Sequence, residues 1–152
     1  MNAALEPKLS QLYQDVILDH NRNPRNFKEL ENPTAYSHGH NPLCGDDYHL
    51  YLHCATGGTI QDVGFKGQGC AISKASASMM TTMIKGKTLA EAEKMGADVL
   101  GLLTRDEVSQ AAKENSGRMV IFEGVKKFPV RVKCATLIWH ALADALKDIG
   151  SH

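Results

Sequence analysis

The spacing of apolar residues changes near residue 70, and this change limits the fold more than any other feature of the chain. Before it, Tyr48, Leu50 and Leu52 alternate with His49 and Tyr51, which is the two-residue period of a half-buried β-strand. After it, apolar residues recur every three or four positions, which is the period of amphipathic helices. The sequence therefore predicts an antiparallel sheet in the first half and helices in the second.

The predicted sheet has about three strands. Residues 48–54 form one strand, Gly57-Gly58 makes a hairpin turn, and residues 59–66 return beside it. The alternation of the returning strand breaks near Asp62, which indicates a β-bulge. Residues 35–40 supply a possible third strand.

Helical spacing and helix-end signals predict the remaining elements. Gly86 is a suitable residue to end a helix. Thr88 with Glu91, and Thr104 with Glu107, match the capping-box pattern, in which the two side chains bond each other's backbone N–H groups at a helix start. The predicted helices cover residues 9–20, 71–85, 89–102, 105–115 and 130–148.

Length and charge favour one globular domain, residues 1–152, and argue against two classes of partner. The 152 residues carry 17 basic and 17 acidic side chains, so no overall positive field attracts nucleic acid. No apolar run approaches the roughly 18 residues that span a bilayer. Glu6 and Asp15 interrupt the stretch where a secretory signal would lie. We therefore expect a cytoplasmic protein whose cysteines are reduced.

The four cysteines occupy two kinds of position. Cys44 lies in a Pro/Gly loop, Cys70 in a glycine-rich turn at a helix start, and Cys134 in the first turns of the last helix. A helix N-terminus stabilises a thiolate, and Asp46 can add an oxygen to a three-sulfur, one-oxygen tetrahedral site. Cys54 continues an apolar strand face and is expected to pack there. The spacing alone leaves a metal site and three unrelated cysteines about equally supported.

Three motifs around these cysteines resemble the iron–sulfur scaffold family of IscU and NifU. They are NPLCGD at residues 41–46, GQGCAIS at 67–73 and FPVRVKCATL at 128–137. Lys133 stands where the IscU branch carries histidine, and a longer stretch suggests a helical insertion near 87–124, so the chain is most similar to the SufU branch. The resemblance implies an α+β fold of the SufE/NifU type, with helices packed on one face of a small antiparallel sheet and a metal site at an exposed tip.

The resemblance also implies a site and a chemistry. Cys44, Asp46, Cys70 and Cys134 would bind one zinc ion. Independently of the resemblance, Arg131 lies three residues before Cys134, and its position supports equally a hydrogen bond to the Asp46 carboxylate and a solvated side chain at the helix start. The protein would accept sulfur from the persulfide of a PLP-dependent, SufS-like cysteine desulfurase and pass it to downstream iron–sulfur carrier or assembly proteins. A desulfurase histidine would displace Cys44 from the metal, which makes Cys44 the expected sulfur acceptor.

Other functions remain open at this point. The same cysteines suit a scaffold that assembles a transient [2Fe–2S] cluster. Outside the family, a purely structural zinc site and a cysteine hydrolase with Cys70 as nucleophile are alternatives. The family motif assigns no histidine to the metal, and we expect His49 and His53 to lie on the outer surface of the sheet.

Overall fold

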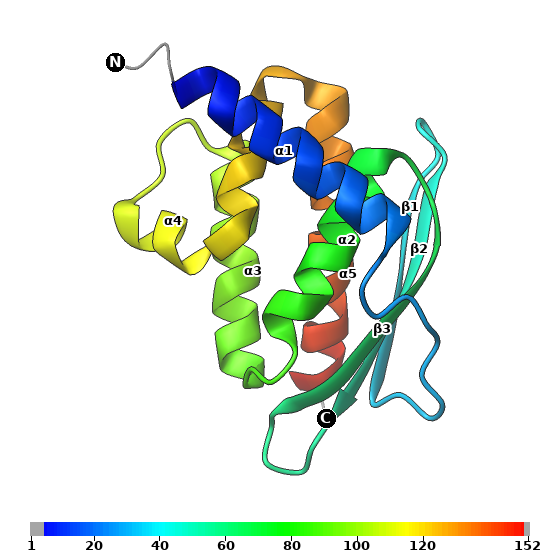
Figure 1. The fold of residues 1–152 in the computed structure, drawn as a ribbon. Coiled ribbons are helices and arrows are strands. Elements are labelled where there is room, and N and C mark those ends of the chain that lie inside the picture. Colours follow the sequence, from blue (N-terminus) through cyan, green and yellow to red (C-terminus); the bar gives the residue numbers. More distant parts are fainter. Residues whose placement is uncertain (1–4, 151–152) are drawn as a thin grey trace.

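The computed structural model describes residues 5–150, with the side chains of residues 11–149 (Figure 1). Its elements follow in the order α1 Leu5–Arg22, β1 Ala35–Asn41, β2 Asp46–Cys54, β3 Ile60–Gln68, α2 Ala71–Ile84, α3 Leu89–Thr104, α4 Gln110–Asn115, the 3-10 helix η1 Gly117–Lys127 and α5 Pro129–Gly150.

The sheet is antiparallel, with strand order β1-β2-β3. The inner-facing residues of β2, among them Tyr48, Leu50 and Leu52, are fully buried. Helices α2 and α5 pack against the sheet, and Figure 1 shows the helices gathered on one side of it. The predicted α+β architecture, with helices on one face of a small sheet, is confirmed.

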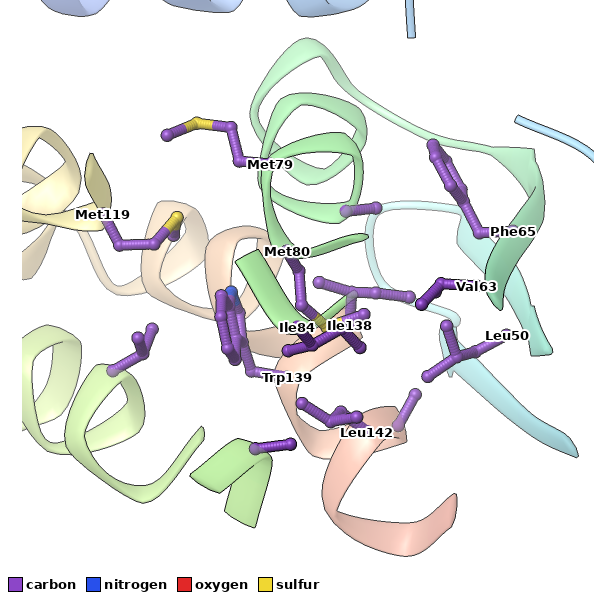
Figure 2. Packing of buried hydrophobic residues seen from close by; sticks show 14 of the residues in the cluster. Leu50, Val63, Phe65, Met79, Met80, Ile84, Met119, Ile138, Trp139 and Leu142 are labelled. Carbon is purple, nitrogen blue, oxygen red and sulfur yellow. The ribbon is translucent and has the colours of Figure 1, made fainter. Parts of the chain in front are cut away.

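The core lies between the sheet, α2 and α5. Figure 2 shows Trp139 and Ile138 of α5 among Met80 and Ile84 of α2, with Leu50 on the sheet side. The Trp139 Nε1–H donates to Ser76 Oγ at 3.1 Å, and Ser76 Oγ donates to the Ala135 carbonyl at 2.7 Å. Trp139, the largest fully buried side chain among the described residues, therefore has a hydrogen-bond partner for its N–H group, as buried polar groups in proteins generally do.

The predicted bulge is present. His53 pairs with Asp62 and Cys54 with Ile60, so Gln61 is the extra residue of β3. An extra residue bends and twists a strand, and here it lies next to Asp62, where the alternation of the sequence breaks. The third strand is also present, at residues 35–41, and it pairs with β2, a placement that the sequence did not predict.

One helix start was predicted correctly and one was not. Thr88 caps α3 with both bonds of a capping box: the Glu91 N–H donates to Thr88 Oγ1, and the Thr88 N–H to Glu91 Oε1. Thr104, by contrast, is the last residue of α3, and its hydroxyl donates to the Leu100 carbonyl at 2.6 Å. Its neighbours Leu102 and Leu103, both fully buried, hold this turn in the helix, so Thr104 cannot adopt the extended backbone of a cap.

The fourth helix therefore begins later than residue 105. Helix α4 starts at Gln110, where the Ser109 hydroxyl accepts a hydrogen bond from the Ala112 N–H at 3.1 Å. It is followed by η1, which the hydrophobic spacing did not predict. Within residues 5–150, no helix combines the length and apolar character that crossing a bilayer requires.

Candidate metal centre

The predicted site residues come from three separate parts of the chain: the β1–β2 hairpin, the start of α2 and the start of α5. Figure 1 shows the tip of the hairpin and the first turn of α2 at the same end of the molecule. In the hairpin, the Gly45 N–H bonds the Asn41 carbonyl at 2.9 Å. Gly45 has φ +73°, in the left-handed region that glycine tolerates best. The tight turn brings Cys44 back toward Asp46.

Asp46 is the centre of the hydrogen-bond network. Its Oδ1 accepts from the Cys70 backbone N–H at 2.9 Å and from Ser73 Oγ at 3.1 Å. Its Oδ2 accepts from the Cys44 thiol at 3.2 Å. The side chain is completely buried. Oδ1 accepts hydrogen bonds from the N-terminus of α2, and Oδ2 accepts one from a thiol.

The glycines before Cys70 make this close approach possible. A Cβ atom at Gly69 would lie 2.5 Å from Asp46 Oδ1, 2.5 Å from Ser73 Oγ and 2.7 Å from Tyr48 Oη. Gly67 has φ +140°, and a Cβ there would lie 2.0 Å from the Asp47 carbonyl oxygen. Glycine is therefore needed at both positions, because the backbone of this turn packs too closely against the site to leave room for a Cβ atom.

The thiols of Cys44 and Cys134 lie together although 90 residues separate them. Their sulfurs are 3.7 Å apart, and Cys134 is only 4% exposed. The ligand atoms of Cys44, Asp46 and Cys134 all lie within 4.8 Å of one another. The structure thus gathers three of the four predicted ligands into one group of thiol and carboxylate donors.

Cys70 adjoins this group in a different role. It is the N-cap of α2, and its sulfur accepts a hydrogen bond from the Ser73 N–H at 3.4 Å. The N-terminal end of the helix dipole favours negative charge on that sulfur. Its own N–H holds Asp46, so the residue acts on the site through both backbone and side chain.

The surroundings of Cys134 and Tyr48 disfavour negative charge on these two side chains unless a cation is present. Burial raises the pKa of Cys134, and the adjacent Cys70, Asp46 and Cys44 raise it further. Burial also raises the pKa of Tyr48 to about 12, although its hydrogen bond with Ser73 acts in the opposite direction. A divalent cation among these donors would reverse the effect and ionise the thiols. The donor set therefore suits a thiolate-binding metal such as zinc.

Arg131 has a neighbour that the sequence did not indicate, whereas Cys54 packs against the core as predicted. The Arg131 guanidinium carbon lies 4.4 Å from the centre of the Phe128 ring. Among residues 5–150, no ion pair joins Arg131 to Asp46. Cys54 ends β2, half-buried against the core and outside the metal-ligand group, and burial raises its pKa.

Sequence reasoning missed a second group of ligand atoms. His38, Asp47 and His49 present donor atoms within 4.8 Å of one another. The two-residue alternation places His49 and Asp47 on the same face of one strand. What the sequence could not supply is the pairing of β1 with β2, which sets His38 opposite His49.

A known protein family matches the part of the chain that contains the cysteine centre. A family model described as NifU-like N terminal domain matches residues 12–135, which include Cys44, Cys70 and Cys134. The chain belongs to this family. The resemblance predicted from the motifs is therefore confirmed.

Relatives in the family are similar over nearly the whole chain. The zinc-dependent sulfurtransferase SufU of Bacillus subtilis is 42% identical over 145 residues, covering 95% of this chain and 96% of that protein. The iron–sulfur cluster assembly scaffold protein IscU of Streptococcus pyogenes is 39% identical, covering 92% and 86%. The crystal structure of SufU from Fervidobacterium islandicum matches with a TM-score of 0.80 and 36% identity, covering 87% of this chain and 94% of that one. The chain is thus a member of an iron–sulfur cluster assembly family.

Proposed function

We propose that this protein accepts persulfide sulfur from a cysteine desulfurase, as a SufU-type assembly protein with zinc held by Cys44, Asp46, Cys70 and Cys134. The observation that carries the proposal is the convergence of the Cys44, Asp46 and Cys134 donor atoms beside the N-cap Cys70. The 42% identity with a zinc-dependent sulfurtransferase supports it.

The residues fit zinc in both donor chemistry and arrangement. Thiolates and a carboxylate oxygen are ligands that zinc takes in tetrahedral sites. The Cys44 thiol donates a hydrogen bond to Asp46 Oδ2, so the sulfur and the carboxylate oxygen would be available together to hold a cation. When bound, zinc supplies the positive charge that keeps the buried thiols ionised.

Cys44 is the sulfur acceptor in this proposal. It lies on a turn and is half-buried, whereas Cys134 is 4% exposed in a helix and Cys70 caps α2. The Cys44 thiolate attacks the outer sulfur of the donor persulfide and forms a new S–S bond. The S–S bond of the donor breaks, and the donor cysteine leaves as a thiolate. Sulfur moves without an external oxidant or reductant.

Exposed apolar side chains lie close in sequence to two of the predicted ligands, Cys44 and Cys134, and suit a protein partner. Leu43 is 83% exposed beside Cys44, and Val130 is 65% exposed one helical turn before Cys134. Exposed apolar groups that gather near a polar site are typical of protein interaction surfaces. They support docking of the desulfurase here, and later of a downstream carrier or assembly protein.

The test combines metal analysis of the purified protein with release of alanine by a SufS-like desulfurase. We expect about one zinc per chain and faster alanine release with the wild-type protein. Cys44→Ser should stay folded and lose the stimulation, while the matched control Cys54→Ser should retain both zinc and stimulation. Equal stimulation by Cys44→Ser would refute its role as acceptor.

Two alternatives make different predictions in the same experiment. The identity with a scaffold protein, IscU, favours a [2Fe–2S] scaffold as the second candidate. Zinc-free protein that gains visible absorption on anaerobic reconstitution with iron and sulfide would support that function. A purely structural zinc site would instead make Cys44→Ser unfold.

A further inference from the structure

The outer face of the sheet carries a cluster of histidines unrelated to the cysteine centre. His38 and His49 are directly opposite each other on β1 and β2, and His40 is opposite Asp47. The strands alternate in burial, so all four side chains lie on the face away from the helices. The rings of His38 and His49 are parallel, with centres 4.5 Å apart, and the His40 ring stacks on His38 at 6.1 Å.

The ligand atoms of this cluster lie close to one another. His38 Nε2 lies 2.6 Å from Asp47 Oδ1, and His49 Nε2 lies 3.8 Å from the same oxygen. All three ligand atoms are within 4.8 Å of one another. Ligand atoms of a tetrahedral zinc site are roughly 3.4 Å apart, since each is about 2.0–2.1 Å from the metal. The two printed separations from Asp47 Oδ1, 2.6 and 3.8 Å, lie on either side of that spacing.

A neighbouring tyrosine orients one of the ligands. The Tyr36 hydroxyl is hydrogen-bonded to His49 Nδ1, and the two rings stack with centres 5.8 Å apart. Nδ1 is therefore occupied, and Nε2 is the ring nitrogen left facing Asp47. Histidine ligands of metals are commonly held in this way, with the second nitrogen bonded to a partner that fixes the ring.

We propose that His38, Asp47 and His49 form a second metal site that binds a divalent transition-metal ion such as Zn²⁺, with His40 available as a fourth ligand. Two imidazoles and a carboxylate are ligands that such ions prefer. The side chains are 43%, 39% and 37% exposed respectively, so the ion would exchange readily with solvent. Because Asp46 and Asp47 are successive strand residues, they serve opposite faces of the sheet.

The test is a calorimetric titration of untagged protein, already saturated with one equivalent of zinc, with further Zn²⁺. We expect a second, weaker equivalent to bind wild-type protein and to be lost in His38→Gln/His49→Gln, with the first equivalent unchanged. His53→Gln is the matched control, because it alters an exposed histidine of β2 outside the group. Tyr36→Phe should weaken the second event about tenfold.

The outcome is independent of the function proposed for the cysteines. If the cysteine centre bound no zinc, the histidine-dependent event would still appear as the first equivalent. A wild-type protein without this event would overturn the second site. An event of unchanged affinity and stoichiometry in His38→Gln/His49→Gln would overturn it equally.

Discussion

Replacing Gly69 by alanine should damage the cysteine centre by a purely steric route. The new Cβ would lie 2.5–2.7 Å from Asp46 Oδ1, Ser73 Oγ and Tyr48 Oη. Carbon atoms in good contact are about 3.5–4.0 Å from their neighbours, so these groups must move by several tenths of an ångström or more. Overpacking of this kind costs about 1–3 kcal/mol of stability. Because Asp46 must shift, we also expect zinc affinity to fall about 10- to 100-fold.

The measurement is urea unfolding of wild type and Gly69→Ala, each with excess zinc and with a chelator. Zinc that binds only the folded chain raises the free energy of unfolding. The histidine cluster is the same in both proteins, so a difference in this zinc effect between wild type and Gly69→Ala reports on the cysteine centre. Gly57→Ala is the matched control, since a Cβ there meets no atom within 4 Å. If Gly69→Ala gained as much stability from zinc as wild type, the argument that Gly69 positions Asp46 would be refuted.

Three further predictions concern the rest of the fold. Thr88→Ala should lower the free energy of unfolding by about 1 kcal/mol through loss of a helix cap, while Thr104→Ala should cost less because Thr104 caps nothing; equal losses would contradict the corrected helix start. Ser76→Ala removes the acceptor of the buried Trp139 N–H and should cost about 1–3 kcal/mol, measured by urea unfolding; a neutral result would show that another acceptor replaces it. Burial lowers the pKa of His20 below its ordinary value of 6.5. As the pH falls below about 6.5, the unfolded chain therefore binds more protons than the folded chain, and the free energy of unfolding should decrease. In chelated protein His20→Gln should show a smaller fall, and an equal fall would assign the pH dependence to other groups.

The extent of successful prediction differed between elements for physical reasons. The capping box at Thr88 is a local interaction between residues three apart, and so is readable from the sequence. The same pattern failed at Thr104 because burial of Leu102 and Leu103 keeps that turn helical. A weak local preference is easily outweighed by tertiary packing.

The cysteine centre shows a similar division. The glycine-rich turn and helix start at Cys70 were visible in the sequence, and the motifs supplied the family. The intervals between the cysteines did not establish that they meet, since no short-range rule connects Cys44 with Cys134. Their 3.7 Å approach depends on how α5 packs against the β1–β2 hairpin.

The sequence by itself determined the periods, the turns and the capping box at Thr88, because these arise from interactions between residues close along the chain. Tertiary structure alone decided which distant side chains meet: Cys44 with Cys134, and His38 with Asp47 and His49. The histidines meet because of the strand register: a shift of one residue would place the His38 side chain on the buried face of the sheet. The cysteines meet because of helix packing, since only the docked α5 brings the Cys134 sulfur to the hairpin.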